Sequence, residues 1–69
     1  MIEIAILKNY DEESHRAGVQ LMGSLTTYLD HIKVARNIKA EDMVTGRHVY
    51  VAISDSNPRS AAIIAIFDP

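Results

Sequence analysis

Two segments of this chain are apolar on both faces of the β-strand that each would form, and this feature constrains the fold most. Residues 2–7 read Ile-Glu-Ile-Ala-Ile-Leu, and residues 61–67 read Ala-Ala-Ile-Ile-Ala-Ile-Phe. Successive side chains of a strand point to opposite faces of its sheet. A sheet with one face in solvent shows polar residues at alternate positions, and apart from Glu3 these segments have none. Both faces of these strands therefore need to be covered.

The chain is short for that task. Its 69 residues fit a single domain, residues 1–69, and a chain of this size buries only roughly 60% of its unfolded surface. It contains no cysteine, so neither a disulfide nor a thiolate-bound zinc stabilises it. Composition is that of an ordinary globular domain, with 48% hydrophobic and 23% charged residues. A second copy of the chain is the simplest cover for the remaining apolar face.

Hydrophobic residues recur at steps of three and four between residues 21 and 32, which predicts an amphipathic helix packed on the sheet. Asp11 stands at its N-cap position, with Glu12 and Glu13 in the first turn. The residues of this apolar stripe are Leu21, Met22, Leu25, Leu29 and Ile32.

Strands are predicted at residues 2–8, 48–54 and 61–67, and a turn at residues 54–60 joins the last two into a hairpin. Residues 40–46 are predicted to form a polar turn that ends at Gly46, either with or without one helical turn. Residues 31–38 either continue the helix through Arg36 or form another strand. We favour the strand, because a helix from residue 12 to 36 would measure about 37 Å.

The predicted fold class is therefore α+β, with the order β-α-(β)-β-β. One amphipathic helix packs on a small, mostly antiparallel sheet of three or four strands, and another subunit covers the second sheet face. The function that follows is a non-enzymatic, homo-oligomeric binding module whose partner is a second copy. The predicted subunit interface consists of Ile2, Ile4, Ile6, Leu7, Ile63, Ile64, Ile66 and Phe67.

Charge argues against general nucleic-acid binding, because the formal net charge is −2. Lys33, Arg36, Lys39 and Arg47 form a basic strip that could bind nucleic acid or an acidic partner protein, but we favour its interpretation as a solvated edge. The longest apolar run, residues 61–67, is far too short to span a membrane, and the N-terminus has no signal-peptide pattern. We expect a cytoplasmic protein without a cofactor or a membrane partner.

A small enzyme is one alternative, in which His48 or His31 would act with a nearby carboxylate. Its motifs are lacking: the histidines do not show a metal-binding spacing, and neither a nucleophile elbow nor a glycine-rich phosphate loop is present. A small inhibitor or accessory protein of a mobile element is another alternative, suggested by the short length and the lack of motifs.

The layout is similar to that of the dodecins. The resemblance lies in a strand followed by Asp11-Glu12-Glu13-Ser14, and in the seven residues from Leu29 to Ala35 at the predicted helix-to-strand junction. Dodecins are small flavin-storing oligomers, so the resemblance implies an oligomer with an apolar ligand site between subunits. The family stacks flavin on a tryptophan, and this chain has none. As a small-ligand carrier, the protein would line its inter-subunit cavity with Tyr50, Phe67 and Met22.

Overall fold

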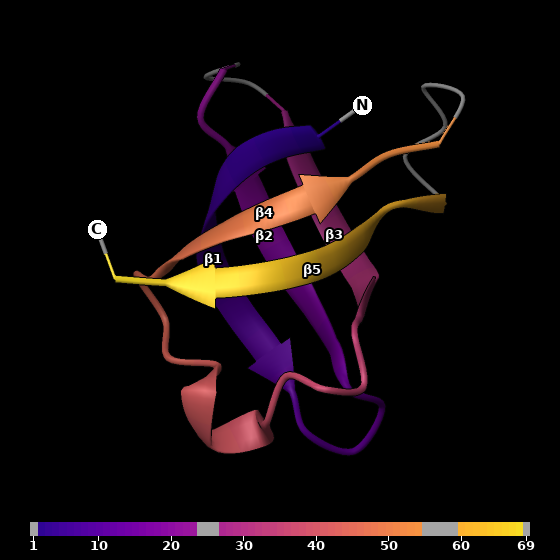
Figure 1. Ribbon diagram of the computed structural model, residues 1–69, viewed down its shortest axis with the longest axis vertical. Helices are drawn as coiled ribbons and strands as arrows, with labels where there is room; N and C mark the ends of the chain where they lie inside the picture. The colour runs from indigo at the N-terminus through magenta and orange to yellow at the C-terminus, as the bar shows by residue number, and fades with distance from the viewer. Residues whose placement is uncertain (1, 24–26, 55–59, 69) are drawn as a thin grey trace.

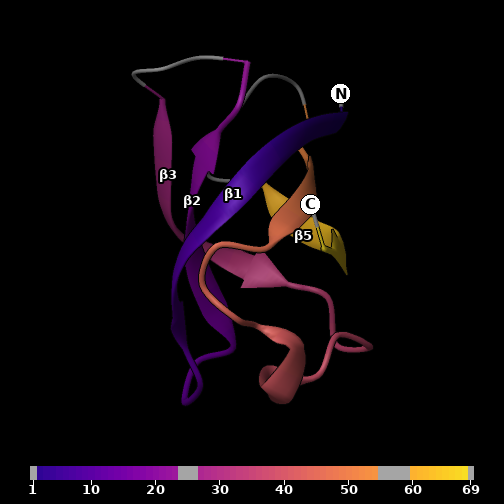
Figure 2. The ribbon, with the colours of Figure 1, turned by 90° about the vertical axis from the view of Figure 1, so that its left-hand side faces the viewer.

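The computed structural model describes residues 2–23, 27–54 and 60–68, and within them the chain forms a closed β-barrel (Figures 1 and 2). One 3-10 helix, η1 (Ala40–Asp42), lies between the third and fourth strands. The strands are β1 (Ile2–Asp11), β2 (Arg16–Leu21), β3 (Tyr28–Val34), β4 (His48–Ala52) and β5 (Ala62–Phe67).

The barrel has the strand order β1-β2-β3-β5-β4 and closes between β4 and β1. The first half of the long strand β1 pairs with β4 and its second half with β2. β3 and β5 are parallel and meet in a short seam, where Lys33 pairs with Ala62 and Val34 with Ile63. This topology is that of the OB-fold, a five-stranded Greek-key barrel. Because one architecture carries many functions, the function has to be argued from the side chains.

The predicted amphipathic helix is wrong, and with it the α+β fold class. In the part of the chain that the structure describes, η1 is the longest helix, and strand β2 occupies residues 16–21. Leu21 and Leu29 belong to two antiparallel strands, so their spacing reflects two sheet positions rather than one helical stripe. Leu25 lies outside the described residues. The sheet has five strands in place of the predicted three or four.

The acidic segment that resembled a helix start forms a hairpin turn. The Asp11 carboxylate accepts hydrogen bonds from the Glu13 backbone N–H (3.1 Å) and the Ser14 hydroxyl (2.9 Å). An aspartate satisfies backbone donors in such a turn in the same way as at a helix N-cap. His15 then adopts a left-handed backbone (φ 54°), after which the chain enters β2 antiparallel to β1. Local sequence therefore gave the same signal for two different structures.

The other predicted strands are confirmed, with boundaries that agree within three residues. β4 and β5 form the predicted antiparallel hairpin, although residues 55–59 of its turn lie outside the described residues. The turn at residues 40–46 contains η1 and ends at Gly46, whose φ is +98°. The strand interpretation of residues 31–38 holds in part, because β3 begins earlier, at Tyr28, and ends at Val34.

The core fills the inside of the barrel with the inward side chains of the strands. Ile38 and Met43, from the connection between β3 and β4, belong to the same core. Burying a side chain of this kind contributes about 1.5–3 kcal/mol. The largest fully buried side chains are Leu7, Val19, Val49, Val51 and Ile63. The barrel thus covers the inner face of its own strands, and the face that remains for a partner is the outer one.

Candidate functional site

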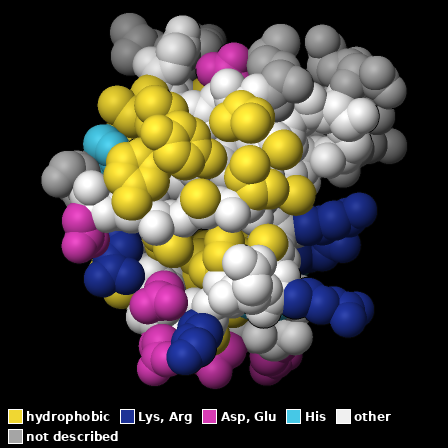
Figure 3. Space-filling model, viewed as in Figure 1, with side chains coloured by type: hydrophobic (Ala, Val, Ile, Leu, Met, Phe, Trp, Pro, Cys, Tyr) yellow, Lys and Arg dark blue, Asp and Glu magenta, His cyan; other side chains and the backbone are white. Residues whose placement is uncertain are grey.

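The outer surface of the first half of β1, of β4 and of β5 is apolar. The residues that point outward form three rows across these strands: Ile2–Ala52–Ala62, Ile4–Tyr50–Ala65 and Ile6–His48–Phe67. None of the nine is a lysine, arginine, aspartate or glutamate. In Figure 3, hydrophobic side chains gather over these strands. These nine residues together with Ile64 are termed the apolar face.

Several large side chains of the apolar face are well exposed. The exposed fraction is 62% for Ile2, 40% for Ile4, 38% for Tyr50 and 42% for Ile64. Single exposed apolar residues are common on protein surfaces, but a contiguous group of them marks an interaction site or an aggregation hazard. The grouping of these residues, rather than the exposure of any one of them, makes this face the candidate site.

A β-bulge decides which residues of β5 point outward. β5 carries one extra residue, Ile64, opposite the step from Tyr50 to Val51 in β4. A bulge of this kind changes the alternation of side chains beyond it. Ile66 consequently packs against the core, and Phe67 lies on the outer side beside β4.

Aromatic rings occupy the second and third rows of the apolar face. The Phe67 ring centroid lies 4.9 Å from that of Tyr50 and 5.7 Å from that of His48. Aromatic pairs at these separations are stabilising and hold each other in place. The face therefore presents a fixed aromatic cluster on β4 and β5, flanked by the isoleucines of β1.

The structure separates the predicted interface residues into two groups. Leu7 and Ile63 are fully buried, and Ile66 packs against the core, so these three face the barrel interior. Tyr50 was not among the predicted interface residues and was expected between subunits only in the small-ligand carrier alternative, yet it lies on the apolar face. The residues that do lie on the apolar face are Ile2, Ile4, Ile6, Ile64 and Phe67.

The residues of the predicted basic strip lie in different places. Lys33 and Arg36 line one pocket near the end of β3. Arg36 also lines a different pocket, beside η1, together with Lys39. Arg47 forms an ion pair with Asp68, with 3.0 Å between Nε and Oδ1. The structure thus connects three of the four cations through Arg36, which lines both pockets, and sets Arg47 against a carboxylate.

The histidines of the enzyme alternative are not brought together. His48 packs on Phe67 within the apolar face, whereas His31 lies on β3, and β5 separates the two strands. The pKa of Asp11 is lowered chiefly by its hydrogen bond from Ser14, with a smaller effect from the charge of His31. Among the described residues, no group of three or more potential metal ligands occurs.

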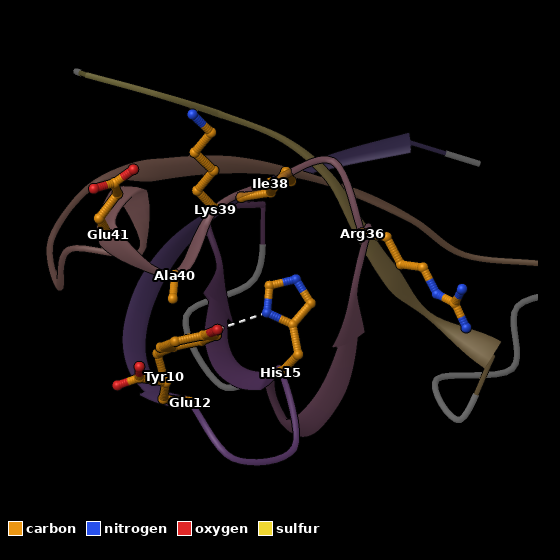
Figure 4. Close-up of a pocket in the computed structure, with 8 residues that line it drawn as sticks. All are labelled: Tyr10, Glu12, His15, Arg36, Ile38, Lys39, Ala40 and Glu41. Carbon is orange, nitrogen blue, oxygen red and sulfur yellow. Dashed lines mark hydrogen bonds between the residues drawn. The ribbon is translucent and has the colours of Figure 1, made fainter.

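A pocket of about 670 Å³ lies between the β1–β2 turn and the segment that leads into η1 (Figure 4). The Tyr10 hydroxyl lies 2.6 Å from His15 Nδ1, and His15 Nε2 lies 3.1 Å from the Ala35 carbonyl oxygen. Because a carbonyl only accepts, Nε2 donates to Ala35 and Nδ1 accepts the Tyr10 proton. Burial, followed by the charges of Glu12 and Asp11, raises the pKa of Tyr10, which keeps that proton in place.

The Tyr10–His15 pair acts as a structural tie rather than as an acid–base pair. Both nitrogens of His15 are already engaged, and Figure 4 shows the charged ends of Arg36 and Lys39 pointing away from the two rings. The pair fastens the β1–β2 turn to the chain that follows β3. No convergent set of catalytic groups faces this pocket among the residues that line it.

Comparisons of the chain with protein-family models, with curated proteins and with solved structures gave no match. Within the described residues, no helix has the length and apolar character needed to cross a bilayer. The apolar face is therefore the feature from which a function can be argued.

Proposed function

We propose that this protein is a non-enzymatic, homo-oligomeric interaction module, and that its apolar face binds a second copy of the chain. One observation carries the proposal: Ile2, Ile4, Tyr50, Ile64 and Phe67 share the outside of a barrel whose core is already filled. A closed barrel needs one apolar face per strand. Leaving a second one in water costs about 25 cal/mol for each Å² of apolar area.

A second copy suits this face better than an unrelated protein. In a two-fold dimer the same patch lies on both sides of the contact, so the patch has to be complementary to itself. A face without formal charges meets its own copy without repulsion. Homodimer interfaces are also more apolar than other interfaces, and aromatic residues near their centre dominate the binding energy. Tyr50 lies on the central strand of the three and would be that anchor.

The required area is available on these strands. A standard interface covers about 800 Å² on each partner, which is under a fifth of the 4485 Å² that this barrel exposes. The outer sides of three of the five strands contribute to the face. Association would also stabilise a fold whose own core is small.

Native mass spectrometry and light scattering of the wild-type protein and of Ile4→Glu test this proposal. We expect the wild type to form a defined oligomer. The variant places a charge in the middle row and should weaken association by at least about 30-fold, or about 2 kcal/mol. Val44→Glu is the matched control, because Val44 is 49% exposed but lies in the connection between η1 and β4 and is not one of the residues of the apolar face.

Circular dichroism should show that both variants keep the wild-type fold. A wild-type protein that stays monomeric at high concentration would contradict the proposal. So would an Ile4→Glu variant that is folded and as fully assembled as Val44→Glu.

A further inference from the structure

A second pocket, of about 330 Å³, lies where β2 begins and β3 ends, next to the short seam in which Lys33 pairs with Ala62. It is termed the basic pocket, and its lining is Ser14, His15, Arg16, Lys33, Val34 and Arg36. In Figure 3, lysine and arginine side chains stand at the edge of the molecule nearest the end of β3. The pocket brings together residues from two strands and from the bend after β3.

The charges of the basic pocket are not balanced by its lining. Arg16 and Lys33 are direct cross-strand partners, an arrangement in which like charges repel. Arg36 adds a third cation, and none of the lining residues is a carboxylate. The ion pairs that the described residues form both belong to Arg47. Three cations thus share one pocket without a described counter-charge within ion-pair distance.

The nearest carboxylate in the register is already occupied. Asp11 lies opposite Arg16 on the other side of β2. Its two oxygens accept hydrogen bonds from the Glu13 backbone N–H and the Ser14 hydroxyl, at 3.1 and 2.9 Å. Asp11 therefore holds the β1–β2 turn together and is not directed into the basic pocket as an ion-pair partner.

The backbone around the pocket is arranged to hold Arg16. Its Nη1 donates to the carbonyl oxygen of His31 (3.1 Å), which leaves the other N–H groups of the guanidinium for a ligand. His31 has a left-handed backbone (φ 54°) in the bulge that β3 forms opposite Gly18. His15, which lines the pocket, has the same φ of 54°. Strained positions of this kind cluster at binding sites, where the strain fixes the geometry of the site.

From this geometry we propose that the basic pocket binds the phosphoryl group of a small phosphorylated ligand between Arg16, Lys33 and Arg36. Arginine matches the oxygens of a phosphate in bidentate fashion, and lysine adds a compact positive charge. An anion at this position removes the repulsion between Arg16 and Lys33. A volume of about 330 Å³ exceeds that of the phosphoryl group alone and accommodates part of an attached organic group. None of the residues that line the site belongs to the apolar face, although Lys33 pairs with Ala62 at the edge of that face.

The test is a calorimetric and NMR titration of the full chain with inorganic phosphate and, in parallel, with glycerol phosphate at low ionic strength. We expect saturable binding of at least one of them. Lys33→Gln and Arg36→Gln should each weaken it by about tenfold, as expected for loss of a charge-assisted hydrogen bond. Lys39→Gln is the matched control, because it removes the same charge from a residue that lines the other pocket, and it should change the affinity less than twofold.

Tighter binding of glycerol phosphate than of inorganic phosphate identifies an ester as the ligand, and equal binding identifies the free anion. Without any anion, Lys33→Gln should unfold at the same temperature as the wild type or higher, since it relieves a repulsion. The proposal is overturned if neither phosphate binds, including the case in which only a single-stranded oligonucleotide does. It is also overturned if Lys39→Gln weakens binding as much as Lys33→Gln, because general electrostatic attraction then explains the effect.

Discussion

The two sides of this barrel differ in the polarity of the side chains that point outward. On β2 and β3, buried residues such as Val19 and Ile32 are followed by polar outward residues such as Gln20 and Lys33. On β1 and β5, apolar residues point both inward and outward. The inner faces of all the strands build the same core, so the core cannot account for the difference. Folding of the barrel requires apolar residues at the inward positions, and it does not determine whether the outward residues are polar or apolar.

The polar side also satisfies its own surface groups. The Asn9 amide donates to the Tyr28 hydroxyl (2.6 Å) and accepts from the Gly18 backbone N–H (3.0 Å). The Tyr28 ring lies across Gly18, so that a Cβ at position 18 would collide with the hydroxyl. The apolar side has no comparable arrangement that removes Ile2 or Ile64 from water. The β1–β2–β3 side satisfies these polar groups within the subunit, whereas the apolar side leaves large hydrophobic side chains in solvent.

The largest effect is expected from two neighbours on β5 that face opposite ways. Ile63→Ala empties part of the core and should lower the free energy of unfolding by about 2–5 kcal/mol. Ile64→Ala should leave the stability of the monomer almost unchanged and weaken self-association on the order of tenfold. Urea denaturation of dilute protein and light scattering at increasing concentration separate the two quantities. Equal loss of monomer stability in both variants would show that Ile64 belongs to the core.

A smaller effect is expected at Gly18 on the polar side. Gly18→Ala pushes away the Tyr28 hydroxyl and breaks its bond with Asn9, which should cost about 1 kcal/mol. In a Tyr28→Ala background the same substitution should cost clearly less, because the two residues act on one contact. A double-mutant cycle of urea denaturation measures this coupling. If the two costs are additive, Tyr28 does not pack across Gly18. If Gly18→Ala changes self-association, the polar side also contributes to assembly.

The smallest effect concerns pH and the turn between β1 and β2. Hydrogen bonds from Ser14 and from the backbone lower the pKa of Asp11 below its ordinary value of 3.8. The ionised carboxylate therefore stabilises the fold above pH 3.8, and this contribution is lost as the pH falls through the lowered pKa. Asp11→Asn cannot titrate, so its deficit in melting temperature should shrink in that acidic range. A deficit that stays constant from pH 7 to acid would contradict the role given to the charge.

Much of the strand structure could be predicted from the sequence, because short apolar runs bounded by turn residues, as in β1, β4 and β5, are a local signal. The helix prediction failed where local signals are ambiguous. Asp11 provides the same hydrogen bonds in a hairpin turn as at a helix N-cap, and Leu21 and Leu29 meet a helical spacing by coincidence. Gly18 was the available warning, since it weakens a helix but fits a close approach between strands.

The candidate site was predicted only in part, because the sequence shows which residues are apolar but not which way each of them points. The excess of apolar residues in residues 2–7 and 61–67 pointed to an uncovered face. The sequence did not reveal the bulge at Ile64, which sends Ile66 inward and Phe67 outward. Nor did it reveal that Arg16 would lie beside Lys33, because strand pairing joins residues that are far apart along the chain.

By itself, then, the sequence determined where most strands and turns lie, and that the apolar side chains exceed what one small core can hold. Tertiary structure decided which apolar side chains went inside and which cations came together. The physical reason is that inward and outward directions are defined only when the sheet closes. Closure depends on non-local pairs such as Lys33 with Ala62 and Val34 with Ile63, which no local pattern encodes.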